Sequence, residues 1–217
     1  VVCHGVNLQF NSDFRFLELL RPWVRNTNER TCKLLDDRMI LTDAALLEQA
    51  LTGAEDAFTA LYRRRQGGVY RFALQMTGST AIAEDVTQEA FLALLLHGTR
   101  YDEARGTVAS FLYGIARNLV LRRLDRRGGS DVEITEDCAG PEDLLEDLTR
   151  RESIEQVRQA VLSLPPVFRE VVVLCDLQDS SYEDAAAALD CPVGTVRSRL
   201  SRGRAMLARK LRGVAMV

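Results

Sequence analysis

The chain has 217 residues, of which 47% are apolar and 27% charged, so it has room for one large or two small folded domains. Its net charge of −3 does not by itself indicate nucleic-acid binding. Five scattered cysteines without a CxxC pair disfavour a disulfide scaffold or a zinc knuckle and are typical of free thiols in a reducing cytoplasm. No apolar run approaches the roughly 20 residues of a membrane span, and the N-terminus lacks a secretory signal pattern, so we expect a cytoplasmic protein without membrane insertion.

Residues 1–41 form a leader without helical periodicity, and amphipathic order begins near Met39. Two interpretations stay open for this leader. Either Met39 is the natural start and the preceding residues are an over-extended gene model, or the leader is a flexible or partner-binding arm.

Residues 42–127 are predicted to form a unit of four helices. Thr42 can cap a first helix that ends at Gly53, and a second helix over 54–77 is stopped by Gly78. A third helix is expected over 81–96 and a fourth over 108–127. No stretch alternates in the way that strands and hairpins require.

Residues 128–149 are predicted to be an acidic, flexible linker, because this stretch holds eight acidic and no basic residues before Arg150. A second helical unit is expected over 150–212. Pro165-Pro166 marks a helix start, and Ser180 or Ser181 caps a helix over 182–189. A turn over 190–193 then leads into a long final helix.

The final helix has one apolar stripe and one polar, basic stripe. Val196, Leu200, Gly203 and Leu207 share the first stripe and are expected to pack on the rest of the unit. The polar side carries Thr195, Ser198, Arg199 and Arg202, with Arg197 and Arg204 at its flanks, and no acidic residue follows position 190. Two helices joined by a short turn, the second rich in arginine, favour a helix-turn-helix in a DNA major groove over an ordinary solvated basic face.

This C-terminal sequence resembles the promoter-reading helix-turn-helix of extracytoplasmic-function sigma factors, the small members of the sigma-70 family. The resemblance rests on residues 181–183 and 191–204, supported by residues 164–166 and 169–171. Asp190 stands where the family usually has glycine, and Ala185 where isoleucine is usual. The resemblance implies that the minus-35 promoter element is read by Thr195, Arg197, Ser198, Arg199, Arg202 and Arg204, with Arg199 the expected base contact.

Residues 83–92 resemble the sigma region that docks on the clamp coiled coil in the largest subunit of RNA polymerase. By that match Asp85, Gln88 and Glu89 are contact residues, and Phe91 and Leu92 support them from the core. The helical pattern alone favours an ordinary solvated surface for this face, and only the resemblance indicates a docking site.

Residues 111–119 resemble the segment that melts and holds the minus-ten element. Aromatic and amide side chains can bind unstacked bases, and arginines can bind phosphates. The implied residues are Phe111, Tyr113, Arg117, Asn118, Arg122 and Arg123. Phe111 stands where tryptophan is common, and Phe111 and Tyr113 are alternatively core residues.

The sequence therefore predicts an all-α protein in which a sigma region 2-like unit and a sigma region 4-like unit act in transcription initiation. The expected partners are core RNA polymerase, promoter DNA and an anti-sigma factor. A free-standing helix-turn-helix regulator is the alternative. Neither histidine, His4 or His97, has a partner at ligand spacing, and no nucleotide-binding or zinc-protease motif is present, so we expect no catalytic site, metal or cofactor.

Overall fold

The computed structural model describes residues 41–127 and 154–214, which we call the N-terminal unit and the C-terminal unit; the expected leader and acidic linker lie outside these residues. The described residues are helical with short turns and contain no strand, which confirms the predicted all-α class. None of the helices described is both long and apolar enough to cross a bilayer.

The N-terminal unit contains four α-helices, α4 (Asp43–Leu51), α5 (Glu55–Thr77), α6 (Thr80–His97) and α7 (Val108–Arg127), with two short 3₁₀ turns between α6 and α7. Local signals set their ends. The Thr42 hydroxyl accepts a hydrogen bond from the Ala45 amide at 3.3 Å, as an N-cap should. Gly78 ends α5 in the left-handed conformation, with φ of 71°, and its amide donates to the Leu74 carbonyl.

The C-terminal unit is described from a helix over 154–162 onward. Next come α9 (Pro166–Val172), a π-helical turn over Val173–Leu177, α10 (Tyr182–Leu189) and α11 (Val193–Val214). Ser181 is the residue that caps α10, since its hydroxyl accepts from the Asp184 amide at 3.0 Å. The α10–α11 turn begins at Asp190, which is left-handed with φ of 49°. Glycine adopts this left-handed conformation without steric cost, which explains why it is usual at this position in the sigma factors that the sequence resembles.

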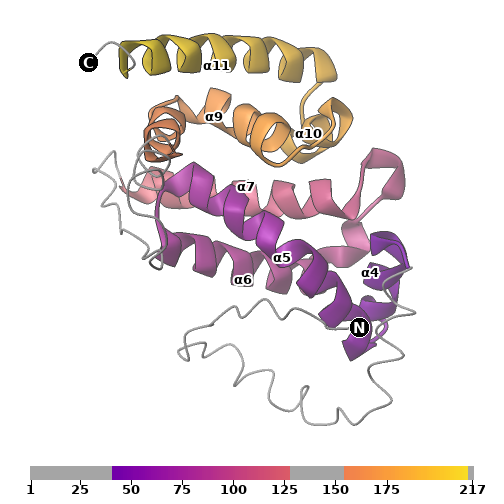
Figure 1. The fold of residues 1–217 in the computed structure, drawn as a ribbon. Helices are drawn as coiled ribbons and strands as arrows, with labels where there is room; N and C mark the ends of the chain where they lie inside the picture. The colour runs from indigo at the N-terminus through magenta and orange to yellow at the C-terminus, as the bar shows by residue number, and fades with distance from the viewer. Residues whose placement is uncertain (1–40, 128–153, 215–217) are drawn as a thin grey trace, which may run out of the picture.

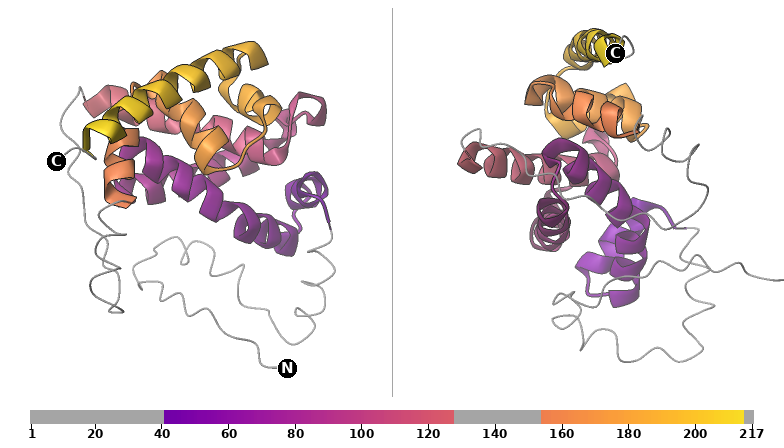
Figure 2. Two further views of the ribbon diagram at one scale, coloured as in Figure 1. Left: turned by 45° about the horizontal axis from the view of Figure 1, so that its top comes forward. Right: turned by 60° about the vertical axis from the view of Figure 1, so that its left-hand side comes forward.

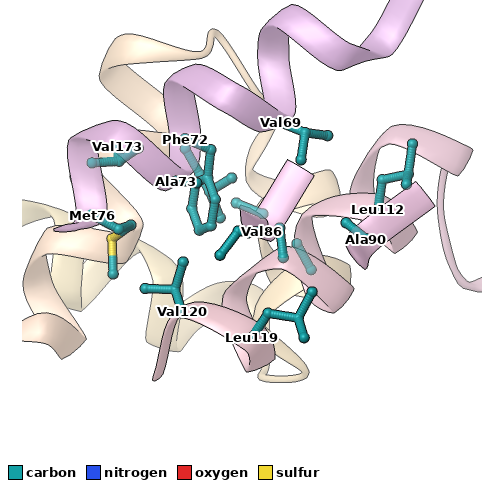
Figure 3. Packing of buried hydrophobic residues seen from close by; sticks show 14 of the residues in the cluster. Val69, Phe72, Ala73, Met76, Val86, Ala90, Leu112, Leu119, Val120 and Val173 are labelled. Carbon is teal, nitrogen blue, oxygen red and sulfur yellow. The ribbon is translucent and has the colours of Figure 1, made fainter. Parts of the chain in front are cut away.

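The two units are stacked in layers, with α11 outermost, α9 and α10 beneath it, and α7 between α10 and the pair α5 and α6 (Figures 1 and 2). One continuous cluster of buried side chains runs through both units. Figure 3 shows Val173 of the C-terminal unit beside Phe72 and Ala73 of α5. The composition allowed two domains with separate cores; in the structure the two cores meet.

Candidate nucleic-acid interface

Helix α11 is held by its apolar stripe, as the sequence predicted. Val196 and Leu200 are buried, and Gly203 lies against α9, where an added Cβ would approach Cγ2 of Val172 to 2.7 Å. Arg197, Ser198 and Arg202 are exposed on the other side. The helix thus turns a basic, solvent-facing surface away from the rest of the molecule, which is the arrangement that a groove-binding helix requires.

Three arginines of α11 have partners within the C-terminal unit. Arg204 donates to both carboxylate oxygens of Asp176, at 2.5 and 3.0 Å, and this hydrogen bonding raises the pKa of its guanidinium. The guanidinium of Arg197 lies 5.7 Å from the ring centre of Tyr182. Arg199 is 3.5 Å from a carboxylate oxygen of Glu170 and is only partly exposed. Of the expected minus-35 residues, Arg197, Ser198, Arg202 and Arg204 are exposed, while Thr195 and Arg199 are half-buried.

The expected minus-ten residues lie along α7 but do not share one face. Phe111 and Asn118 line a cleft of about 310 Å³ that is bounded on its far side by Ala188 and Asp190 of the C-terminal unit. Arg122 is exposed and bonds the Asn118 carbonyl at 3.2 Å. Arg123 is turned toward α6 and pairs with Glu89 at 2.6 Å.

Tyr113 is largely a packing residue in this structure. Its ring centre lies 5.6 Å from that of Phe72, and its hydroxyl lies over Gly68, where an added Cβ would come within 2.8 Å. Burial raises the pKa of the Tyr113 phenol, against the opposing effect of Arg65 and Arg71. Phe111 is half-buried and packs 5.9 Å from the ring of Tyr101. In this structure both aromatic side chains therefore make the packing contacts of core residues, as the alternative interpretation expected.

The expected polymerase-binding residues of α6 differ in how far their side chains are buried. Asp85 and Glu89 are exposed, Gln88 is half-buried, and Phe91 is fully buried against Tyr62, with 4.7 Å between ring centres. Leu92 does not support the core, contrary to the sequence-based expectation. Its side chain is 46% exposed because it is one helical position beyond the buried stripe.

Sequence reasoning missed Glu170, a buried carboxylate that contacts arginines of both α7 and α11. Its side chain is 1% exposed, and its carboxylate accepts from Nε of Arg117 at 2.7 Å and from Nη2 of Arg117 at 3.3 Å. The Arg199 contact reaches the same carboxylate from α11. Glu170 was visible in the sequence only as part of the family-like Arg-Glu-Val run, and nothing in that run indicates a partner 53 positions earlier.

Other polar contacts join the two units around this carboxylate. Arg169 donates to the Met76 carbonyl at 2.5 Å, and Arg158 donates to the Gly78 carbonyl at 3.2 Å. Burial lowers the pKa of Arg169. On the opposite edge, the Thr107 hydroxyl donates to the Asp184 carboxylate at 2.7 Å. No group of histidine, cysteine, aspartate or glutamate within the two described ranges is arranged to hold a metal ion.

Two family models match the chain, one to each unit. Residues 61–129 match sigma-70 region 2, and residues 154–207 match sigma-70, region 4. Among solved structures, CnrH in complex with the cytosolic domain of CnrY is 26% identical, with a TM-score of 0.62 over 79% of this chain and 97% of that one. The sigma factor RpoE in complex with the anti-sigma factor NepR from Bartonella quintana is 25% identical, with a TM-score of 0.56 over 71% and 96%.

Curated relatives match across both units. The ECF RNA polymerase sigma-E factor of Escherichia coli K12 is 35% identical over 188 residues, which is 79% of this chain and 95% of the relative. The ECF RNA polymerase sigma factor SigW of Bacillus subtilis is 31% identical over 76% of this chain and 95% of the relative. SigE of Mycolicibacterium smegmatis is 35% identical over 71% of this chain, but the match spans only 61% of that relative.

Proposed function

The chain belongs to the extracytoplasmic-function sigma factors of the sigma-70 family and so acts in transcription initiation as an RNA polymerase sigma factor, and from this premise we propose how its surfaces divide that work. The observation that carries the proposal is the two-sided character of α11. Val196 and Leu200 anchor one side, and the other side is basic and exposed, in the unit that matches region 4.

The α11 surface binds the minus-35 element of promoter DNA. Arg197, Ser198 and Arg202 are accessible as the molecule stands. Arg199 remains the expected base contact, and to serve it must leave Glu170, which lies 3.5 Å away. Arg204 is held by Asp176 and is better suited to a fixed phosphate contact than to a base edge.

Replacing a base-contacting arginine of α11 is expected to weaken promoter use by about 1–3 kcal/mol and to relax specificity at one position of the minus-35 element. Run-off transcription with core polymerase on a matched promoter set measures this for Arg197→Ala, Arg199→Ala and Arg202→Ala. Arg209→Ala, which also removes an exposed arginine from α11 but lies outside the expected minus-35 set, is the matched control. If all three variants keep full activity and the same minus-35 preference, α11 does not read the promoter.

The α7 surface around the cleft binds the melted minus-ten element. Phe111 and Asn118 provide an aromatic face and an amide at the cleft, and Arg122 provides a positive charge one turn beyond Asn118. Arg117, Arg123 and Tyr113 are engaged with protein partners in this structure, so their contribution to DNA binding requires those contacts to be exchanged.

The exposed face of α6 binds core RNA polymerase. Asp85 and Glu89 supply negative charge there, and Leu92 and Leu96 are apolar side chains that are 46% and 75% exposed. Exposed leucines beside carboxylates suit a partner surface that is basic with an apolar centre.

The double reversal of Asp85→Lys with Glu89→Lys is expected to weaken binding to core polymerase at least tenfold while leaving the fold intact. Glu89 is 50% exposed and Arg123 is 20% exposed, so loss of this pair should cost only a modest part of the stability. The measurement is the dissociation constant by fluorescence anisotropy, with thermal unfolding as the check on folding. Glu48→Lys with Glu55→Lys reverses the same charge at exposed sites on α4 and α5 and should bind normally. Equal affinity of both double variants would remove α6 from the interface.

An anti-sigma factor is the further partner that we propose, because the structurally similar sigma factor RpoE of Bartonella quintana was solved in complex with the anti-sigma factor NepR. The proposed location is the cytoplasm, where core polymerase and promoter DNA are found. No catalytic role is assigned to any residue.

A further inference from the structure

Two exposed arginines of α11 are held by the stretch 176–182, each through a different kind of contact. Arg197 and Arg204 are seven residues apart, so they lie on one stripe of the helix, two turns or about 10 Å from each other. The Arg204 guanidinium donates two hydrogen bonds to the Asp176 carboxylate. The Arg197 guanidinium instead lies over the ring of Tyr182, 5.7 Å from its centre. The two partners leave their arginines with different capacities to bind DNA.

An aromatic ring leaves more of an arginine available than a carboxylate does. The contact with Asp176 occupies Nε and Nη2 of Arg204 and neutralises its charge. A ring attracts the cation through its π face, so most of the five N–H donors of Arg197 stay available to another acceptor. Among the residues that the structure describes, no carboxylate forms an ion pair with Arg197. Tyr182 therefore restricts this side chain without using up its charge.

Arg197 also lies near the end of α11 that would enter a DNA groove first. The recognition helix of a helix-turn-helix contacts base edges with its N-terminal residues, and α11 begins at Val193. Arg197 is four residues from that start, about 6 Å along the axis, whereas Arg204 is eleven residues or about 16 Å away. Arg199 lies in the same turn as Arg197 but is half-buried beside Glu170. Position and exposure both favour Arg197 for contact with a base edge.

Tyr182 is well placed to hold this arginine in one orientation. It is the first residue of α10, directly after the capping residue Ser181, and Ala185 and Ala186 in the next turn are buried against the core. These contacts fix the backbone that carries the ring. The Tyr182 side chain is 36% exposed, so its contact with Arg197 lies close to solvent. At such exposed sites a cation–π contact favours the held orientation by about two- to fivefold.

We propose that Tyr182 is a positioning residue for promoter recognition, whose ring orients Arg197 toward a base edge of the minus-35 element. The proposal rests on the proposed function and adds a residue of α10 to the determinants of specificity, with Arg197 reading a base alongside Arg199. A side chain that is already ordered loses less conformational entropy when it binds. Because Tyr182 acts through Arg197, it affects discrimination at one base pair and leaves the contacts to phosphates unchanged.

Tyr182→Leu tests the role of the ring, with Tyr182→Phe as the matched control. Leucine is apolar but has no π face, whereas phenylalanine keeps the ring and loses only the hydroxyl group. Run-off transcription with core polymerase, on promoters that carry each single-base change of the minus-35 element, measures discrimination at every position. We expect Arg197→Ala to lower discrimination at one base pair about tenfold or more. Tyr182→Leu should lower it at the same base pair about two- to fivefold, and Tyr182→Phe should retain it.

A measurement on the free full-length chain checks the contact without DNA. NMR relaxation of the Nε–Hε group of Arg197 should show a restricted side chain in the wild type and in Tyr182→Phe, and a mobile one in Tyr182→Leu. Thermal unfolding establishes that every variant folds.

The outcomes separate the role of Tyr182 from the proposed function. In the Arg197→Ala background, Tyr182→Leu should cause no further loss, because the side chain that the ring positions is gone. Equal discrimination by Tyr182→Leu and Tyr182→Phe overturns the proposal, as does a loss in Tyr182→Leu that is uniform over all promoters or that persists without Arg197. An unchanged minus-35 preference in Arg197→Ala, Arg199→Ala and Arg202→Ala would instead refute the proposed function of α11 itself.

Discussion

Phe72→Ala is expected to lower the free energy of unfolding by about 3–5 kcal/mol, which is a large part of the stability of a protein of this size. Phe72 is fully buried, packs 5.6 Å from the ring centre of Tyr113, and lies beside Val173 of the C-terminal unit (Figure 3). Removing the ring leaves a cavity where α5, α7 and the π-helical turn meet. Urea unfolding followed by circular dichroism measures the change.

Two variants calibrate this result. Phe72→Leu keeps most of the volume and should cost only about 1–1.5 kcal/mol. Leu96→Ala removes a side chain that is 75% exposed and should change the free energy of unfolding by less than about 0.5 kcal/mol. A cost for Phe72→Ala as small as that for Leu96→Ala would show that the two units do not pack through Phe72 in solution.

Glu170→Ala is expected to lower the free energy of unfolding by about 3 kcal/mol. The substitution leaves Arg117 and Arg199 facing a site from which their carboxylate has gone, and breaking a buried ion pair from one side is costly. The arginine side chains are 23% and 29% exposed, so partial hydration keeps the cost at the lower end of the range for buried pairs. Thermal and urea unfolding provide the measurement.

Glu170→Gln is the informative companion, because the amide oxygen still accepts hydrogen bonds while the charge is lost. Its cost should fall between those of Glu170→Ala and of Glu84→Ala, an exposed glutamate of α6 whose removal should be nearly neutral. Equal stabilities of Glu170→Ala and Glu84→Ala would mean that the Arg117–Glu170–Arg199 contacts are not formed in solution.

Helix positions could be predicted from the sequence because the signals that set them are local. Thr42, Gly78 and Ser181 act within a few residues of themselves, and each forms its expected cap. The burial of Val196, Leu200 and Gly203 followed from the helical period for the same reason. The family resemblance was equally readable, since its motifs are continuous runs of sequence.

The contacts between the units could not be predicted in this way. Glu170 and Arg117 are 53 positions apart, and neither has a local pattern that names the other. The family resemblance also assigned Leu92 to the core, whereas it is 46% exposed; a match of motifs does not show which side of the helix a neighbour covers. The roles assigned to the individual DNA-binding and polymerase-binding residues remain predictions.

The π-helical turn over Val173–Leu177 makes the length of this segment as important as its composition. A π turn holds about one residue more than an α turn would, so the last side chains of this helical segment point in other directions than they would in an uninterrupted α-helix. Asp176 lies inside this turn and meets Arg204 from there. Deleting Leu177, the most exposed apolar residue of the turn, would shorten the segment by one residue, favour α-helical spacing, change the direction of Asp176 relative to Arg204 and shift the start of α10.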